Sequence, residues 1–106
     1  MTETGERRRG TSARTTTRDP EVRTARDAAR RAAEQLGDLI RHRLEGVSAV
    51  RRGEDDGWTV HVDVLEVARI PDTTSLLATY EVGLDPAGDL LQYRRIARYR
   101  RGAQDQ

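Results

Sequence analysis

The segment Trp58-Thr59-Val60-His61-Val62-Asp63-Val64 decides the fold, because apolar and polar residues alternate along its whole length. Successive side chains of a β-strand point to opposite faces, so this alternation predicts a strand with one buried face. The four apolar residues are expected to face the core, and His61 and Asp63 are expected to share the other face. The alternation breaks after Val64, which predicts a bulge near Glu66.

Three further strands are predicted on the two sides of this segment. Polar turns separate them, and Asp85–Asp89 has its turn residues in the order typical of a hairpin. Ile70–Thr73 interrupts the pattern because proline has no amide proton for a ladder. The short connections favour antiparallel neighbours. The predicted strands are residues 47–52, 58–64, 76–84 and 90–100.

The residues before the strands have the periodicity of a helix. Asp19 is a suitable cap and Pro20 suits the first helical position. Apolar residues then recur at spacings of three and four, which indicates one apolar stripe. We predict one helix of about 25 residues that ends before Gly46. The predicted stripe is Val22, Ala25, Ala29, Ala32, Leu36, Leu39 and Ile40.

The predicted fold class is therefore α+β, with one long N-terminal helix packed on a four-stranded antiparallel meander (αββββ). Residues 1–18 are polar and basic, with almost nothing to bury, so we expect a disordered basic tail. Residues 19–101 are expected to form a single domain, and residues 102–106 a flexible C-terminus.

Composition limits the core and the compartment. The chain of 106 residues has no Phe, one Trp and three Tyr, so its core is thin and we expect a partner or an oligomer. The absence of Cys excludes disulfides and thiolate chemistry and fits a reducing compartment. No apolar stretch approaches the roughly 20 residues of a membrane span, and no apolar signal core is present. We expect a cytoplasmic protein with no membrane partner.

Signals of catalysis are weak. His61 and Asp63 are candidates for an acid/base or metal pair, but two ligands close no metal site and His42 is far away on the predicted helix. A solvated polar face is the preferred interpretation. The acidic turn 54–56 lacks the ligand spacing of a calcium loop. The chain has no glycine-rich phosphate loop and no nucleophile elbow. We therefore expect no enzyme, no metal and no cofactor.

The last predicted strand carries an unusual run, Tyr93-Arg94-Arg95-Ile96-Ala97-Arg98-Tyr99-Arg100-Arg101. Interleaved Arg and Tyr occur on surfaces that bind nucleic acid. The same two residue types are enriched in protein–protein hot spots, and charges on an edge strand also discourage aggregation. For this run we prefer a protein partner to nucleic acid. The basic tail carries Glu3 and Glu6 and no aromatic residue, so we interpret it as a flexible tether and not as a nucleic-acid-binding segment.

Four ordered blocks of this sequence resemble the gas vesicle protein O family. The resemblance runs from near Ala28 to the end of the chain, leaves out the tail before Asp19, and departs from the family pattern at Gly83. It implies an accessory role in gas-vesicle formation, with no enzymatic activity and no catalytic residues. The blocks are Gly57–Val60 leading to Val64–Glu66, Arg69–Asp72, Ala78–Val82, and Tyr93–Arg95 with Arg98–Tyr99.

This resemblance suggests a surface for other gas vesicle proteins, shell or accessory, or for a second copy in a homodimer. Arginines on a soluble domain can meet acidic residues of such partners. Two rival hypotheses stay open. One is a nucleic-acid-binding or regulatory protein that uses the Arg-rich ends, and the other is a cystatin-like small-ligand or enzymatic domain. The predicted partner surface is Arg69, Ile70, Pro71, Asp72, Tyr93, Arg94, Arg95, Arg98, Tyr99 and Arg101.

Overall fold

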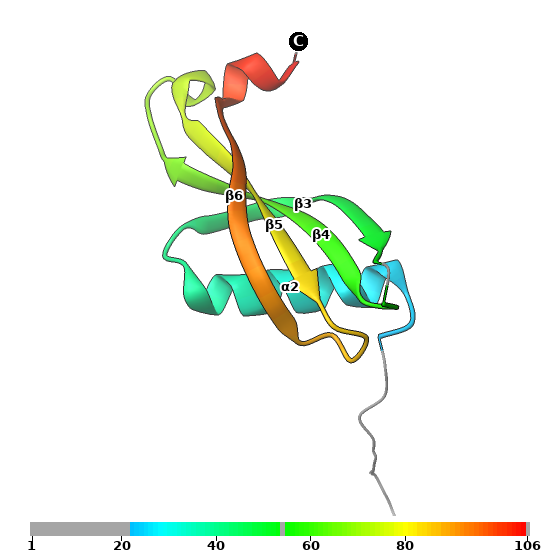
Figure 1. Ribbon diagram of the computed structural model, residues 1–106. Coiled ribbons are helices and arrows are strands. Elements are labelled where there is room, and N and C mark those ends of the chain that lie inside the picture. The colour runs from blue at the N-terminus through cyan, green and yellow to red at the C-terminus, as the bar shows by residue number, and fades with distance from the viewer. Residues whose placement is uncertain (1–21, 54, 106) are drawn as a thin grey trace, which may run out of the picture.

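The computed structural model describes residues 22–53 and 55–105, and it has the αββββ order that the sequence predicts (Figure 1). The four strands form one antiparallel sheet in the order β3-β4-β5-β6. The predicted tail, residues 1–18, lies outside the described residues. The elements are α2 (Ala25–Leu39), β3 (Arg43–Arg52), β4 (Trp58–Val67), the 3-10 helix η1 (Asp72–Thr74), β5 (Leu76–Leu84), β6 (Leu90–Arg100) and the 3-10 helix η2 (Arg101–Asp105).

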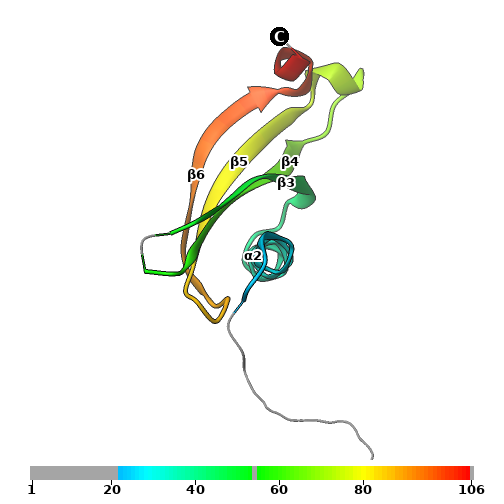
Figure 2. The same ribbon diagram turned by 90° about the vertical axis from the view of Figure 1, so that its right-hand side faces the viewer.

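The helix covers only part of the sheet. Figure 2 shows a curved sheet with α2 lying across its concave face, while β5, β6 and the connection from β4 to β5 extend past the helix. The concave face is therefore divided into a part under α2 and a part that the helix leaves open.

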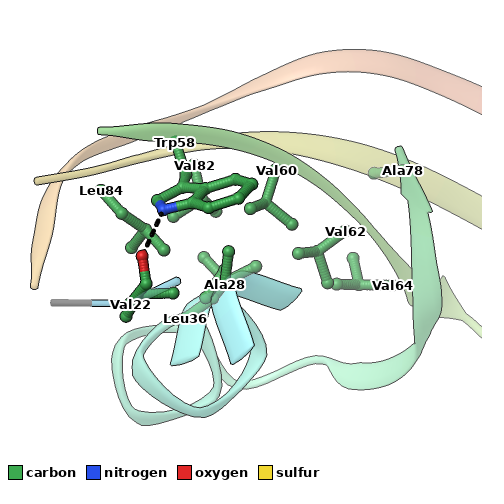
Figure 3. Packing of buried hydrophobic residues seen from close by; sticks show 11 residues of the cluster. Val22, Ala28, Leu36, Trp58, Val60, Val62, Val64, Ala78, Val82 and Leu84 are labelled. Carbon is green, nitrogen blue, oxygen red and sulfur yellow. Dashed lines mark hydrogen bonds between the residues drawn. The ribbon is translucent and has the colours of Figure 1, made fainter. Parts of the chain in front are cut away.

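The core lies between α2 and the apolar face of β4 (Figure 3). Val60, Val62 and Val64 have no exposed surface, as the alternation predicts. Neighbouring side chains from β5 and from the helix complete the cluster. The indole Nε1 of Trp58 donates a hydrogen bond of 3.3 Å to the carbonyl oxygen of Val22, which ties the segment before the helix to the sheet.

The predicted start of the helix is wrong. Asp19 and Pro20 lie outside the described residues, but the helix begins only at Ala25, and Thr24 is its N-cap. The Thr24 hydroxyl accepts a hydrogen bond of 3.1 Å from the Asp27 amide. Val22 stays outside the helix because its amide donates to the carbonyl oxygen of Pro86 at 2.8 Å. This hydrogen bond to Pro86, 64 positions further along the chain, thus shifts the start of the helix away from the residues that the local sequence favours.

The predicted end of the helix is also wrong. The helix ends at Leu39, and the Ile40 amide still donates to the Leu36 carbonyl oxygen at 3.1 Å. Gly46, the predicted stop, lies inside β3, which pairs with β4 from Arg43 onward. Pairing with a strongly alternating neighbour therefore overrides the helical periodicity of residues 40–46, as tertiary context often does.

The buried face of α2 also differs from the predicted stripe. Its buried residues are Ala28, Ala32 and Leu36, at a spacing of four. Ala28 was missing from the predicted stripe, and Leu39, which was included, is 53% exposed. Two of the three buried side chains are single methyl groups, so the helix can approach the sheet closely.

Irregular pairing sets the faces of the outer strands. The predicted bulge near Glu66 is confirmed by a register shift between Leu65 and Val67. Two more shifts in the β5–β6 pairing leave Leu91 and Ile96 without partners in the register. These two residues are 67% and 41% exposed. The shifts also explain why sequence parity alone did not assign the faces of β6.

The contrast between Leu36 and Leu39 gives a direct test of the core. Leu36→Ala should lower the free energy of unfolding by about 2 to 4 kcal/mol, because it opens a cavity under a fully buried side chain. Leu39→Ala makes the same chemical change on the same helix at an exposed site, and should cost less than about 0.5 kcal/mol. Urea unfolding monitored by tryptophan fluorescence measures both. Equal losses would contradict the packing described here.

Candidate interaction surface

The residues predicted to form a partner surface fall into two groups. Arg69–Asp72 lies in the connection between β4 and β5, here called the tip, and Tyr93–Arg101 runs along β6 into η2. Arg101 joins the two groups. Its Nε lies 2.9 Å from Oδ2 of Asp72, and its Nη1 lies 3.1 Å from Oε1 of Glu45. The hydrogen bond to Glu45, with the nearby charge of Asp72, raises the pKa of Arg101 above its ordinary value.

The tip is held by its own hydrogen bonds. The Arg69 amide donates to the Ser75 hydroxyl at 3.0 Å, and that hydroxyl donates to Oδ1 of Asp72 at 3.2 Å. The Thr74 amide donates to the carbonyl oxygen of Pro71 at 3.0 Å, and Ser75 itself is fully buried. The Ile70–Pro71 peptide bond is cis. The hydrogen bonds of Ser75 and Thr74 hold the tip in one defined conformation, although it connects two strands.

A three-residue ion cluster lies on the concave side of β6. Oε2 of Glu66 is 3.1 Å from Nη1 of Arg95, and Oε1 is 2.9 Å from Nε of Arg98. The Glu66 side chain is only 6% exposed, whereas the two arginine side chains are 47% and 51% exposed. A nearly buried carboxylate requires such partners, because burial of an unpaired charge is costly.

Sequence reasoning placed Arg95 and Arg98 on the candidate surface but missed the role of Glu66. The break in alternation after Val64 was the available signal. The register shift at this point turns the Glu66 side chain toward β6, which lies two strands away from β4. No spacing rule in the sequence joins residue 66 to residues 95 and 98.

The opposite, convex face carries a second network. Glu81 accepts a hydrogen bond from Arg94, with Nη2 3.2 Å from Oε1, and its Oε2 lies 3.1 Å from Nε2 of His61. The hydrogen bond with His61, followed by the one from Arg94, lowers the pKa of Glu81 below its ordinary value. Tyr99 pairs with Leu77 on this same face.

The predicted partner residues of β6 are therefore divided between two faces. Arg95 and Arg98 lie with Tyr93 on the concave side, where the Tyr93 ring is 6.1 Å from the ring of Tyr80. Arg94 and Tyr99 lie on the convex side. The structure does not bring all of the predicted residues together on one surface.

His61 and Asp63 share the convex face, as predicted, but each has a partner of its own. Asp63 accepts a hydrogen bond of 2.6 Å from the Thr79 hydroxyl, while His61 contacts Glu81. Both pairs connect β4 to β5 across the sheet. His61 and Asp63 thus belong to two separate pairs across the sheet.

In the part of the chain that the structure describes, no group of three or more His, Cys, Asp or Glu side chains is placed to hold a metal ion. None of the helices in that part is long and apolar enough to cross a membrane.

Residues 11–105 match the family model described as gas vesicle synthesis protein GvpO. The chain belongs to this family. The match begins earlier than the predicted resemblance, which started near Ala28 and left out the tail before Asp19. No solved structure matches the chain.

Three curated relatives belong with this family. Gas vesicle protein O of a Streptomyces species is 55% identical over 76 residues, covering 72% of this chain and 59% of the relative. Gas vesicle protein O1 of Halobacterium salinarum is 39% identical over 79 residues, with 74% and 66% covered. Gas vesicle protein O of Haloferax mediterranei is 36% identical over 76 residues, with 72% and 54% covered. The chain thus matches between about half and two thirds of the length of each relative.

The lowered pKa of Glu81 predicts a pH-dependent contribution to stability. A carboxyl group whose pKa is lower in the folded chain than in the unfolded chain stabilises the fold above its ordinary pKa of 4.5. That contribution is lost as the pH falls through the lowered value. Glu81→Gln should therefore be less stable than the native chain at pH 6, by up to about 1 kcal/mol, and the difference should shrink toward pH 3.

Urea unfolding at several pH values between 6 and 3 measures this difference. Glu34→Gln is the matched control, because Glu34 is exposed on α2 and has no ion pair in the described part of the chain. The control should differ from the native chain by a small amount that does not change with pH. A constant difference for Glu81→Gln would show that its two partners contribute nothing to folding.

Proposed function

We propose that this chain is a non-enzymatic assembly factor for gas vesicles, which acts by binding other gas vesicle proteins in the cytoplasm. Membership of the gas vesicle protein O family supports the vesicle-related role. The Arg95–Glu66–Arg98 cluster is the observation that carries the binding role. It supplies two exposed guanidinium groups in fixed positions on the open part of the concave face.

The charge of this cluster favours an acidic partner. One carboxylate cannot neutralise two guanidinium groups, and each arginine keeps about half of its surface free after pairing. Guanidinium groups bind carboxylates with strong, directional hydrogen bonds. Because Glu66 already restricts both arginine side chains, these side chains would lose less conformational entropy when a partner binds.

Apolar groups beside the cluster add contact area. Tyr93 and Ile96 are 39% and 41% exposed on the same strand. Arginine and tyrosine are both enriched in the hot spots of protein–protein interfaces. The tip and Arg101 extend the proposed surface beyond the end of β6, and Arg94 and Tyr99 extend it to the convex face.

The nucleic-acid alternative is less well supported. Arg94 is paired with Glu81, and Arg101 is paired with Glu45 and Asp72. Arg95 and Arg98 share one carboxylate, Glu66, and only Arg95, Arg98 and Arg100 of β6 lie on the concave face, so in the described part of the chain this face offers a short basic cluster and not a long basic groove. A groove that tracks a phosphate backbone needs a continuous basic stripe.

The small-ligand or enzymatic alternative has lost its main candidate. It depended on a His61–Asp63 pair lining a cavity, whereas each side chain contacts a different residue of β5. A partner-binding role explains the two exposed arginines held by Glu66, for which an enzymatic role gives no function.

Vesicle formation in a host that carries the whole gas-vesicle gene cluster without this gene tests the proposal. Electron microscopy should show no vesicles, and the native gene should restore them. A triple variant, Glu66→Gln with Arg95→Gln and Arg98→Gln, should fail to restore most of them. It removes the charges together, so that no buried carboxylate is left beside missing partners.

The matched control is Arg23→Gln with Arg26→Gln, which removes two exposed arginines from the segment at the start of α2. It should restore vesicles like the native gene. Normal vesicles in the deletion host would refute the assembly role. Full restoration by the folded triple variant would show that partners bind elsewhere on the chain.

A further inference from the structure

Ile70 is an isoleucine side chain presented to solvent on a rigid support. It is 99% exposed, the highest exposure among the large apolar residues of the described chain. The hydrogen bonds of Arg69, Pro71 and Asp72 fix the backbone on both sides of it. A large apolar side chain that is exposed and preordered has the properties of an anchor that enters a pocket of a partner.

The opposite end of the sheet carries a hollow of about 340 Å³. It lies where β4 begins and β5 ends, beside the two hairpin turns, whereas the tip follows the end of β4 (Figure 1). Its accessible apolar lining comes from Pro86 and Leu91, because the side chains of Trp58 and Leu84, which also border it, are buried in the core. Leu91 is 67% exposed and forms part of the rim.

Two glycines leave this hollow open. A Cβ atom at Gly57 would collide with the carbonyl oxygen of Leu84, so only glycine fits there without a backbone shift. Gly83, which departs from the family pattern, also lines the hollow. A Cβ atom there would meet Gln92 at an ordinary contact distance of 3.5 Å, so the absence of a side chain is not required by the strand.

The charges at the two ends are complementary. Arg69 is exposed beside Ile70, and its side chain makes no ion pair within the described residues. Asp55 and Asp85 line the hollow at the other end. An isoleucine that enters the hollow would bring Arg69 toward these carboxylates, which fixes the orientation of the contact as well as its partner.

We propose that a second copy of this chain occupies the hollow, with Ile70 of one copy packed against Pro86 and Leu91 of the next. The tip and the hollow are different surfaces at opposite ends of the sheet, so the contact is heterologous. Contacts of this kind produce open head-to-tail chains unless the rotation closes a ring. Within the proposed surface, the inference assigns the tip to a second copy of this chain and leaves the Arg95–Glu66–Arg98 cluster for other gas vesicle proteins.

The contact is small, so the self-association should be weak and reversible. Sedimentation velocity of the purified chain should show a weight-average mass that rises with concentration between about 10 and 500 µM. Salt should reduce the association, because part of it comes from exposed charges. A chain that remains monomeric over this whole range would overturn the proposal.

Two single variants separate the tip from the hollow. Ile70→Ser removes the anchor, and Leu91→Arg places a cation on the rim, where Arg69 of the next copy would lie. Each should weaken self-association at least tenfold. Leu39→Ser is the control, since Leu39 is an exposed apolar residue on α2, away from both ends. Native-like association by either of the first two variants would contradict the proposal.

Mixing the two variants gives the sharpest test. The Ile70→Ser chain keeps an intact hollow and the Leu91→Arg chain keeps an intact tip, so one functional contact is possible in the mixture. A discrete dimer of twice the 11.9 kDa chain mass should form, and growth should stop there. A symmetric dimer would not be rescued in this way, and absence of the mixed dimer would overturn the head-to-tail contact.

Circular dichroism verifies that each variant is folded. If Leu91→Arg does not fold, Gly83→Val replaces it, because the added side chain fills the hollow while suiting a strand. These measurements use only the purified chain. Their failure would therefore leave the assembly role untouched, and failure of vesicle complementation would leave the self-association untouched.

Discussion

The structure depends on the close contact between α2 and the apolar face of β4. The core contains no phenylalanine, and two of the three buried helix residues, Ala28 and Ala32, are alanines. Valines of β4 can fill the space only because the helix lies close to the sheet. The bonds of Val22 to Trp58 and Pro86 fix where the helix begins relative to that face.

This arrangement leaves little apolar material for the part of the sheet beyond the helix. Ion pairs replace apolar contacts as the main side-chain connections there. Glu66 binds Arg95 and Arg98, Glu81 binds Arg94, and Arg101 joins Glu45 to Asp72. The pairs of Glu66 and Arg101 connect elements that are not neighbours in the chain, whereas the Glu81–Arg94 pair joins the adjacent strands β5 and β6. The same arginines that stabilise this part also give it its exposed positive charge.

The sequence predicts the strands better than the helix ends, and the reason is physical. The alternation of β4 is a local pattern that fits only a strand with one buried face, and the hairpin at Asp85–Asp89 contains its own turn residues. The ends of α2 depend instead on distant partners, since Pro86 holds Val22 outside the helix and β4 pairs with residues 43–52. The candidate surface is the hardest part to predict from the sequence, because register shifts decide which arginines of β6 share a face.

The two edges of the open sheet indicate how such a domain can recognise partners. An exposed edge strand can pair with any other strand, and bulges and charges reduce that risk. Here β3 has two register shifts against β4, and β6 combines two shifts with its arginines. Strand addition is therefore disfavoured at both edges. A partner would then have to contact side chains on the faces and at the ends of the sheet, where the ion cluster, the tip and the hollow lie.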